Sequence, residues 1–211
     1  YEDNPKEYLI ELGSKGDLGN NGYWSYDLGG FYQVFENGKV NDANDARKDR
    51  KGFVLHGALN WDSKEEWAAK VAYTVVDDEA NMGVNVSYDE RYVDSFENPL
   101  EDIMRDSRYA GIGNNQYVTN LQDTKIQLEY IPRNKNKHYL RVAYDMVQAK
   151  DDNKDSTFFA NGAAGRSDKA DVLTAEYRYR LAENTRFRIG YTDFKFGSGD
   201  LKPGYSDYRI F

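Results

Sequence analysis

The chain has 211 residues, a formal net charge of −8, no cysteine and a mean hydropathy of −0.87. The absence of cysteine excludes disulfides and thiolate metal sites. The acidic balance, without a basic cluster, argues against nucleic acid as a partner. No apolar run approaches the ~18 residues of a transmembrane helix.

Aromatic residues make up 15% of the sequence, with 18 tyrosines, 10 phenylalanines and 3 tryptophans. A soluble domain this rich in aromatics would carry more aliphatic residues to fill the space between the rings. Tyrosine and tryptophan concentrate at bilayer interfaces, because each has an apolar ring and a polar group. Low hydropathy fits a transmembrane β-barrel, since half of each strand faces water.

The main pattern along the chain is a period of two, with apolar residues at every second position. It is clearest from Trp67 to Val75, and a period of two predicts a strand with one apolar and one polar face. We expect Gly29 and Gly30 to mark a bend or bulge. The pattern predicts ten strands, around residues 8–12, 24–34, 53–61, 66–75, 84–88, 126–130, 140–146, 173–181, 187–191 and 208–210.

The connections between these segments are of two kinds. Short turns are predicted near Ser63, Asn134 and Asn184, and long polar connections at 37–51, 93–122 and 150–168. Short turns at one rim and long loops at the other are typical of outer-membrane barrels. Two short turns must be separated by an even number of strands, yet three are counted between Ser63 and Asn134. Either residues 107–118 hold a further strand, or residues 65–92 form one long arm.

We therefore expect an all-β fold, an antiparallel transmembrane β-barrel of about ten strands that forms a single domain over residues 1–211. The same pattern also fits part of a larger porin barrel. Because no export signal precedes Tyr1, we expect residues to be missing there. The parity of Tyr208 and Ile210 places Phe211 on the lumen side, so we also expect a few residues beyond Phe211.

The tyrosine-rich hairpins with Asp/Asn loops from Thr124 to Phe211 resemble the C-terminal half of a family of Gram-negative outer-membrane porins. These are the S-layer-homology-anchored porins of Negativicutes. The resemblance implies an outer-membrane location among lipids and passive diffusion of small hydrophilic solutes or ions. It also implies a homotrimer and a cell-wall tether through a domain that lies outside this chain.

Lumen-facing positions on the later strands carry a group of arginines. A ladder of arginines on one wall would bias ion passage. We expect the acidic connection around residues 94–106 to fold into the lumen as a constriction loop, through Glu97, Glu101, Asp102 and Asp106. The alternative is that the loop stays outside and that the arginines pair with Glu129, Asp145 and Glu176. The candidate lumen and selectivity residues are Arg141, Arg178, Arg180, Arg186, Arg188, Glu129 and Glu176.

Catalysis and cofactors have little support in the sequence. The chain has two histidines, His56 and His138, and no serine can be placed beside His56 as a nucleophile. Acidic pairs such as Asp77-Asp78 lack the spacing of a calcium loop. We expect no enzyme activity, no metal and no cofactor. Two other functions stay open: a small plugged barrel that serves as a structural anchor or adhesin, and a soluble β-sandwich that binds carbohydrate.

Overall fold

The structure is a computed structural model that describes residues 6–36, 50–78, 80, 82–83, 117–132, 137–151, 169–182, 185–196 and 205–210. Its regular elements are strands. They are β1 (Lys6–Leu18), β2 (Trp24–Glu36), β3 (Arg50–Asp62), β4 (Trp67–Val76), β5 (Met82–Gly83), β6 (Tyr117–Val118), β7 (Leu121–Tyr130), β8 (His138–Gln148), β9 (Lys169–Ala182), β10 (Thr185–Phe196) and β11 (Tyr205–Ile210).

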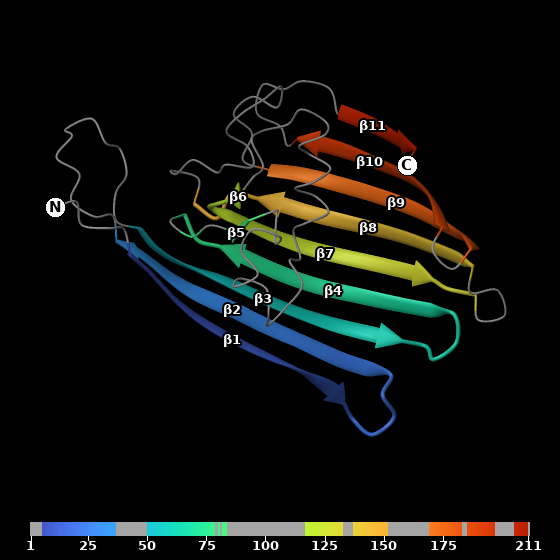
Figure 1. Ribbon diagram of the computed structural model, residues 1–211, viewed down its shortest axis with the longest axis horizontal. Coiled ribbons are helices and arrows are strands. Elements are labelled where there is room, and N and C mark those ends of the chain that lie inside the picture. Colours follow the sequence, from blue (N-terminus) through green and yellow to red (C-terminus); the bar gives the residue numbers. More distant parts are fainter. Residues whose placement is uncertain are drawn as a thin grey trace.

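Nine of these strands form one curved antiparallel sheet in the order β1-β2-β3-β4-β7-β8-β9-β10-β11 (Figure 1). The predicted all-β, antiparallel class is confirmed. Within the described residues the sheet is open, with β1 and β11 as its edges. Closure into a cylinder therefore stays an expectation.

The two rims of the sheet differ as predicted. The strand ends that the short connections join lie at one rim, and those that the long connections join lie at the other (Figure 1). β4 pairs with β7 along its whole length, so no strand lies between them. The strand predicted at 84–88 falls outside the described residues, whereas β6 lies within the 107–118 stretch where a further strand was considered. With β5 and β6 included, the number of strands between the two short turns is even.

Local chemistry explains the short turn between β3 and β4. The Asp62 carboxylate accepts a hydrogen bond from the Lys64 backbone N–H at 2.7 Å, and Lys64 has φ 60°. The Ser63 hydroxyl oxygen accepts from the N–H groups of Glu65 at 3.2 Å and Trp67 at 3.0 Å. Side chains that satisfy the turn's own backbone donors favour this sharp reversal.

Of the predicted bend or bulge at Gly29 and Gly30, the bulge is not found. The pairing of β2 with both β1 and β3 runs through Gly29 and Gly30 without a register shift, so there is no bulge there. Gly30 is required for a different reason. A Cβ at this position would lie 2.5 Å from the Val54 carbonyl oxygen, which is closer than two such atoms can approach.

The two faces of the sheet differ in exposure and, toward the short turns, in polarity. Toward the long connections the buried face also carries apolar side chains, among them Val54, Val76, Leu121, Val172 and Phe194. We call the face that carries Trp67, Val71 and Val142 the outer face, and the face that carries Lys125 and Glu176 the inner face. Trp67, Val71 and Val142 are 44%, 52% and 40% exposed, whereas Lys125 and Glu176 are 6% and 2% exposed. This is the reverse of a soluble domain, in which the apolar face is the buried one. Among the described residues there is no helix of the length and apolarity needed to cross a membrane.

Candidate functional site

The outer face carries an apolar band that crosses the sheet from β1 to β10. Its members share strand parity and exposure: Tyr8, Ile10, Leu12, Leu18, Trp24, Leu28, Tyr32, Leu55, Leu59, Trp67, Val71, Tyr73, Ile126, Leu128, Leu140, Val142, Tyr144, Met146, Leu173, Leu181, Phe187 and Ile189. Monomeric soluble proteins rarely expose a continuous apolar surface on this scale. The face is therefore suited to an apolar environment.

The band runs obliquely to the strands. One row of hydrogen-bond partners on the outer face is Ser14, Leu28, Gly57, Tyr73, Thr124, Met146, Asp171 and Lys195. In β1 the apolar side chains reach Tyr8, six residues from this row toward the long connections. In β10 they end at Tyr191, four residues from the row toward the turns.

The border of the band thus moves by ten residues over the seven steps from β1 to β10. At ~3.3 Å per residue and ~4.8 Å between strands, the shift and the width it covers are each roughly 33 Å. The strands therefore cross the band at about 45°, close to the tilt of strands in transmembrane barrels.

Aromatic side chains gather on the outer face near the short turns. The Trp67 and Tyr130 rings have centroids 4.7 Å apart on β4 and β7. On β8 and β9, the His138 Nδ1 atom lies 2.7 Å from the Tyr177 hydroxyl, and the His138 ring lies 5.0 Å from that of Tyr179. Rings with polar atoms at the edge of an apolar band are typical of an interface between hydrocarbon and water.

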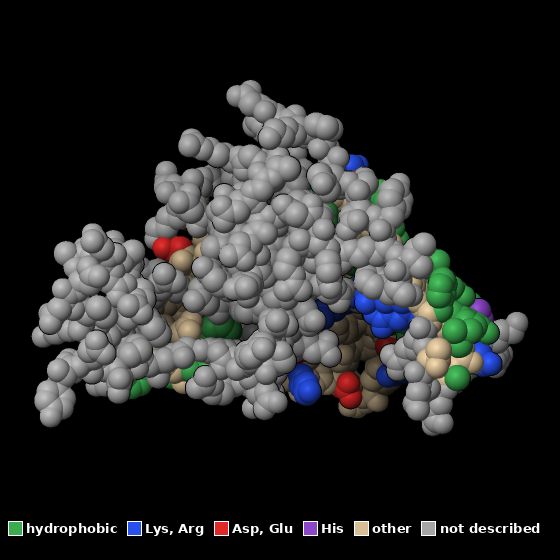
Figure 2. All heavy atoms as spheres, turned by 45° about the horizontal axis from the view of Figure 1, so that its top comes forward, with side chains coloured by type: hydrophobic (Ala, Val, Ile, Leu, Met, Phe, Trp, Pro, Cys, Tyr) green, Lys and Arg blue, Asp and Glu red, His purple; other side chains and the backbone are tan. Residues whose placement is uncertain are grey.

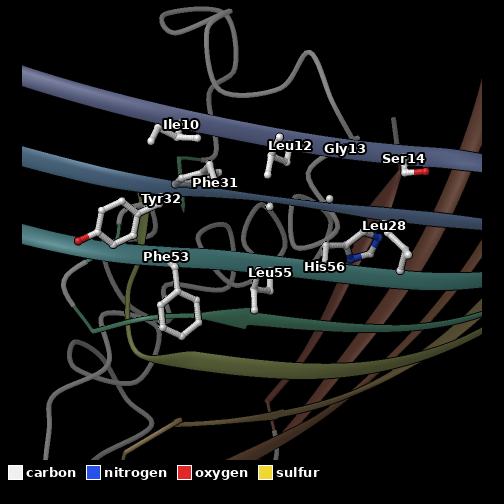
Figure 3. Close-up of a pocket in the computed structure, with 12 residues that line it drawn as sticks. Ile10, Leu12, Gly13, Ser14, Leu28, Phe31, Tyr32, Phe53, Leu55 and His56 are labelled. Carbon is white, nitrogen blue, oxygen red and sulfur yellow. The ribbon is translucent and has the colours of Figure 1, made fainter.

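A hollow of about 500 Å³ interrupts the outer face of β1, β2 and β3 (Figure 3). Ile10, Leu28, Gly30 and Leu55 are among its lining residues.

The inner face holds buried polar side chains that pair across strands. Lys125 of β7 forms an ion pair with Asp145 of β8 at 3.3 Å, and both side chains are buried. The His56 Nδ1 atom lies 3.0 Å from the Thr74 hydroxyl oxygen across β3 and β4. Buried charges need partners of this kind. Figure 2 shows basic and acidic side chains close together on the face turned to the viewer and hydrophobic side chains at the right-hand edge, where Figure 1 places the turns.

The strongest charge cluster lies on β8, β9 and β10. The Glu176 carboxylate forms ion pairs with Arg178 and Arg188, and its Oε2 lies 3.7 Å from a guanidinium nitrogen of Arg141. The registers bring these residues together, because Arg141 is the cross-strand partner of Glu176, and Arg178 is the partner of Arg188. We call Arg141, Arg178 and Arg188 the arginine trio. One carboxylate therefore joins three guanidinium groups from three strands.

A second set of contacts positions one member of the trio. The Arg178 guanidinium lies over the Tyr139 ring, 4.8 Å from its centroid, in a cation–π arrangement. The Tyr139 hydroxyl donates a hydrogen bond to the Glu129 carboxylate, which also accepts one from the Gln127 amide at 2.5 Å. These contacts hold the Arg178 guanidinium at a defined place on the inner face.

The other candidate residues are placed as follows. Arg180 lies two residues from Arg178 on the same face, with an exposed side chain, and its cross-strand partner is Arg186. The side chain of Arg186 is outside the described part of the structure. The proposed constriction residues Glu97, Glu101, Asp102 and Asp106 also lie outside the described residues.

Sequence reasoning missed two inner-face features. Lys125 and the buried Asp123 were not assigned to a strand, although their parity with Gln127 and Glu129 was a usable signal. It also missed Asn120, which lies between β6 and β7, is fully buried, has φ 51° and contacts Asp151 beyond the end of β8. The Asn120 side chain donates to the Asp151 carbonyl at 3.0 Å and accepts from the Asp151 N–H at 2.9 Å. Asparagine tolerates this left-handed conformation better than most residues.

Among the described residues, no group of three or more histidine, aspartate or glutamate side chains could hold a metal ion.

Comparison with known proteins adds a likeness to a solved structure. No protein-family model matches the sequence, and no curated protein matches it. The crystal structure of the outer membrane channel DcaP of Acinetobacter baumannii is similar, with a TM-score of 0.48 and 16% sequence identity over 96% of this chain and 51% of that chain. The chain thus spans about half the length of that channel.

Proposed function

We propose that this chain forms the wall of an outer-membrane porin, through which small hydrophilic solutes or ions diffuse passively. The observation that carries the proposal is the reversed polarity of the sheet. Large apolar side chains such as Val71 and Val142 are exposed on one face, whereas Lys125, Arg141 and Glu176 are buried on the other. An outward apolar face and an inward polar face are the pattern of a transmembrane β-barrel.

The oblique band supports the same proposal. A membrane is a flat slab, so an apolar belt around tilted strands must cross them at the tilt angle. The shift of ten residues from β1 to β10 fits strands tilted at about 45°. In the β-sandwich alternative, a second layer of protein would have to cover Trp67, Val71 and Leu140, which are 44%, 52% and 42% exposed.

In this proposal the arginine trio, Arg180 and Arg186 face the lumen together with Glu129 and Glu176 and bias the passage of ions. The acidic connection with Glu97, Glu101, Asp102 and Asp106 narrows the lumen. Trimer formation and a cell-wall tether outside this chain belong to the same proposal, because they rest on the resemblance of residues 124–211 to porins.

The test is reconstitution of the full-length protein. We expect stepwise, ohmic conductance in planar bilayers and permeation of small sugars in liposome swelling. Protein that inserts into bilayers but passes neither ions nor sugars would support the plugged anchor and overturn the porin. Protein that stays monodisperse in buffer without detergent would support the soluble sandwich instead.

A further inference from the structure

The arrangement of charges around Glu176 goes beyond a general bias in selectivity. Glu176 is buried, with 1% of its side chain exposed, whereas the side chains of Arg178 and Arg188 are 36% and 28% exposed. The carboxylate thus lies beneath guanidinium groups that remain partly open on the inner face. The arginine trio carries three positive charges. Two carboxylates lie beside it on the inner face, Glu176 and Glu129, and Glu129 is the cross-strand partner of Arg141 on β7.

Each guanidinium group presents its N–H donors in a planar fork. A carboxylate or phosphate binds a guanidinium fork through two parallel hydrogen bonds. Oxyanions are therefore the ligands that the exposed sides of Arg178 and Arg188 fit best.

We infer that the arginine trio is a binding site for small oxyanions, and that Glu176 is an internal anion that competes with them. The inference rests on the proposed function, because a solute reaches the inner face only through a lumen. When an oxyanion arrives, Arg178 and Arg188 exchange part of their contact with Glu176 for contact with the solute. The Tyr139 ring holds the Arg178 guanidinium in place during this exchange.

This arrangement lowers the affinity of the site for oxyanions. A site without Glu176 would hold an oxyanion tightly and slow its passage, since conduction requires that a solute also leave. An internal carboxylate lowers the affinity without removing the positive charge that attracts the solute. The site therefore favours transient binding over retention.

The experiment is single-channel recording in chloride, with phosphate or acetate added as the blocking anion. In the unaltered protein we expect brief, concentration-dependent current interruptions with phosphate and acetate that chloride alone does not produce. Glu176→Gln should lengthen these interruptions several-fold and shift the reversal potential toward anion selectivity. Arg188→Gln and Arg178→Gln should each shorten or abolish them.

The matched control is Asp27→Asn. Asp27 also lies on the inner face, but on β2, toward the opposite edge of the sheet from β9. Asp27→Asn changes the charge of the inner face by the same amount as Glu176→Gln. We expect Asp27→Asn to leave the length of the interruptions unchanged. Equal effects of Asp27→Asn and Glu176→Gln would show that overall wall charge, not a site, governs oxyanion passage, and would overturn the inference.

The outcomes separate this inference from the proposed function. Absence of conductance in the unaltered protein counts against the porin itself. A conducting protein whose phosphate and acetate interruptions are indifferent to Arg178→Gln and Arg188→Gln counts against the oxyanion site alone. If Glu176→Gln does not fold because it leaves three like charges together, the two arginine variants still decide the matter. If only one of the two oxyanions interrupts the current, the site is specific for that chemistry.

Discussion

The requirement for glycine at position 30 can be tested directly. A Cβ there would lie 2.5 Å from the Val54 carbonyl oxygen and 2.9 Å from Leu55 Cδ2. The backbone of β2 or β3 must move to accept it. We therefore expect Gly30→Ala to lower the free energy of unfolding by about 1–3 kcal/mol, the usual cost of overpacking. Urea denaturation of the folded protein in detergent measures this.

Gly57→Ala is the matched control on the neighbouring strand and the same face. There the added Cβ would meet only Leu28 Cδ2 at 3.2 Å, and a leucine side chain can turn away. We expect a smaller loss of stability than for Gly30→Ala. Equal losses in the two variants would mean that the close approach to Val54 is not what requires glycine at position 30.

At the same scale, the sequence predicts part of the charged site and misses the rest. Strand parity is sufficient to place Arg141, Arg178 and Arg188 on one face, because alternate residues of a strand point the same way. Parity does not say which carboxylate each guanidinium reaches. That three of them share Glu176 depends on the registers of β8, β9 and β10 and on side-chain rotamers, which one sequence does not specify.

At the scale of whole strands, the alternation of apolar and polar residues predicts where a strand lies but underestimates its length. The strand predicted at 126–130 is β7, which begins five residues earlier at Leu121. The part of β7 that the alternation does not predict carries Gln122 and Thr124 on the outer face, beyond the border of the apolar band. β10 likewise continues past Tyr191 through Asp193 and Lys195. Where a strand leaves the band, its outer face becomes polar, while the inner face carries buried apolar residues such as Leu121 and Phe194. The outward-facing period of two therefore ends in the sequence although the hydrogen bonding continues.

The same border gives a prediction for β8. Val142 lies inside the band and Gln148 outside it, on the same face of the same strand. An arginine in the hydrocarbon costs about 2–4 kcal/mol near the bilayer midplane and about 0–1 kcal/mol near the interface. We therefore expect Val142→Arg to make folding into liposomes less favourable by about 2–4 kcal/mol. Gln148→Arg should change the free energy of folding little. Urea titrations of folding into lipid vesicles measure both.

The order of these two effects is the informative result. If Gln148→Arg costs as much as Val142→Arg, the outer face of β8 has no polar rim. If neither substitution has a cost in lipid, the apolar face of β8 does not contact hydrocarbon, and the assignment of that face to the bilayer is wrong.

On the scale of the whole molecule, the oblique band makes depth in the bilayer independent of register. Leu28 and Lys195 belong to one row of hydrogen-bond partners, yet Leu28 lies inside the band and Lys195 outside it. Ile10 and Ile189 are far apart in register, yet each lies two residues inside the border on its own strand, at Tyr8 and Tyr191 respectively. A flat bilayer across strands tilted at about 45° should place Ile10 and Ile189 at one depth.

Single-cysteine labelling can measure these depths, because the chain has no cysteine of its own. We expect fluorophores at Ile10→Cys and Ile189→Cys to be quenched equally by lipids brominated at one acyl position. A label at Leu28→Cys should be quenched more by bromines near the bilayer centre, and one at Lys195→Cys should report water. Equal depths for Leu28 and Lys195, with unequal depths for Ile10 and Ile189, would mean that the membrane plane follows the hydrogen-bond rows. The strands would then be upright in the bilayer, and the apolar band could not be a membrane belt, because a flat bilayer cannot follow a border that climbs ten residues across the sheet.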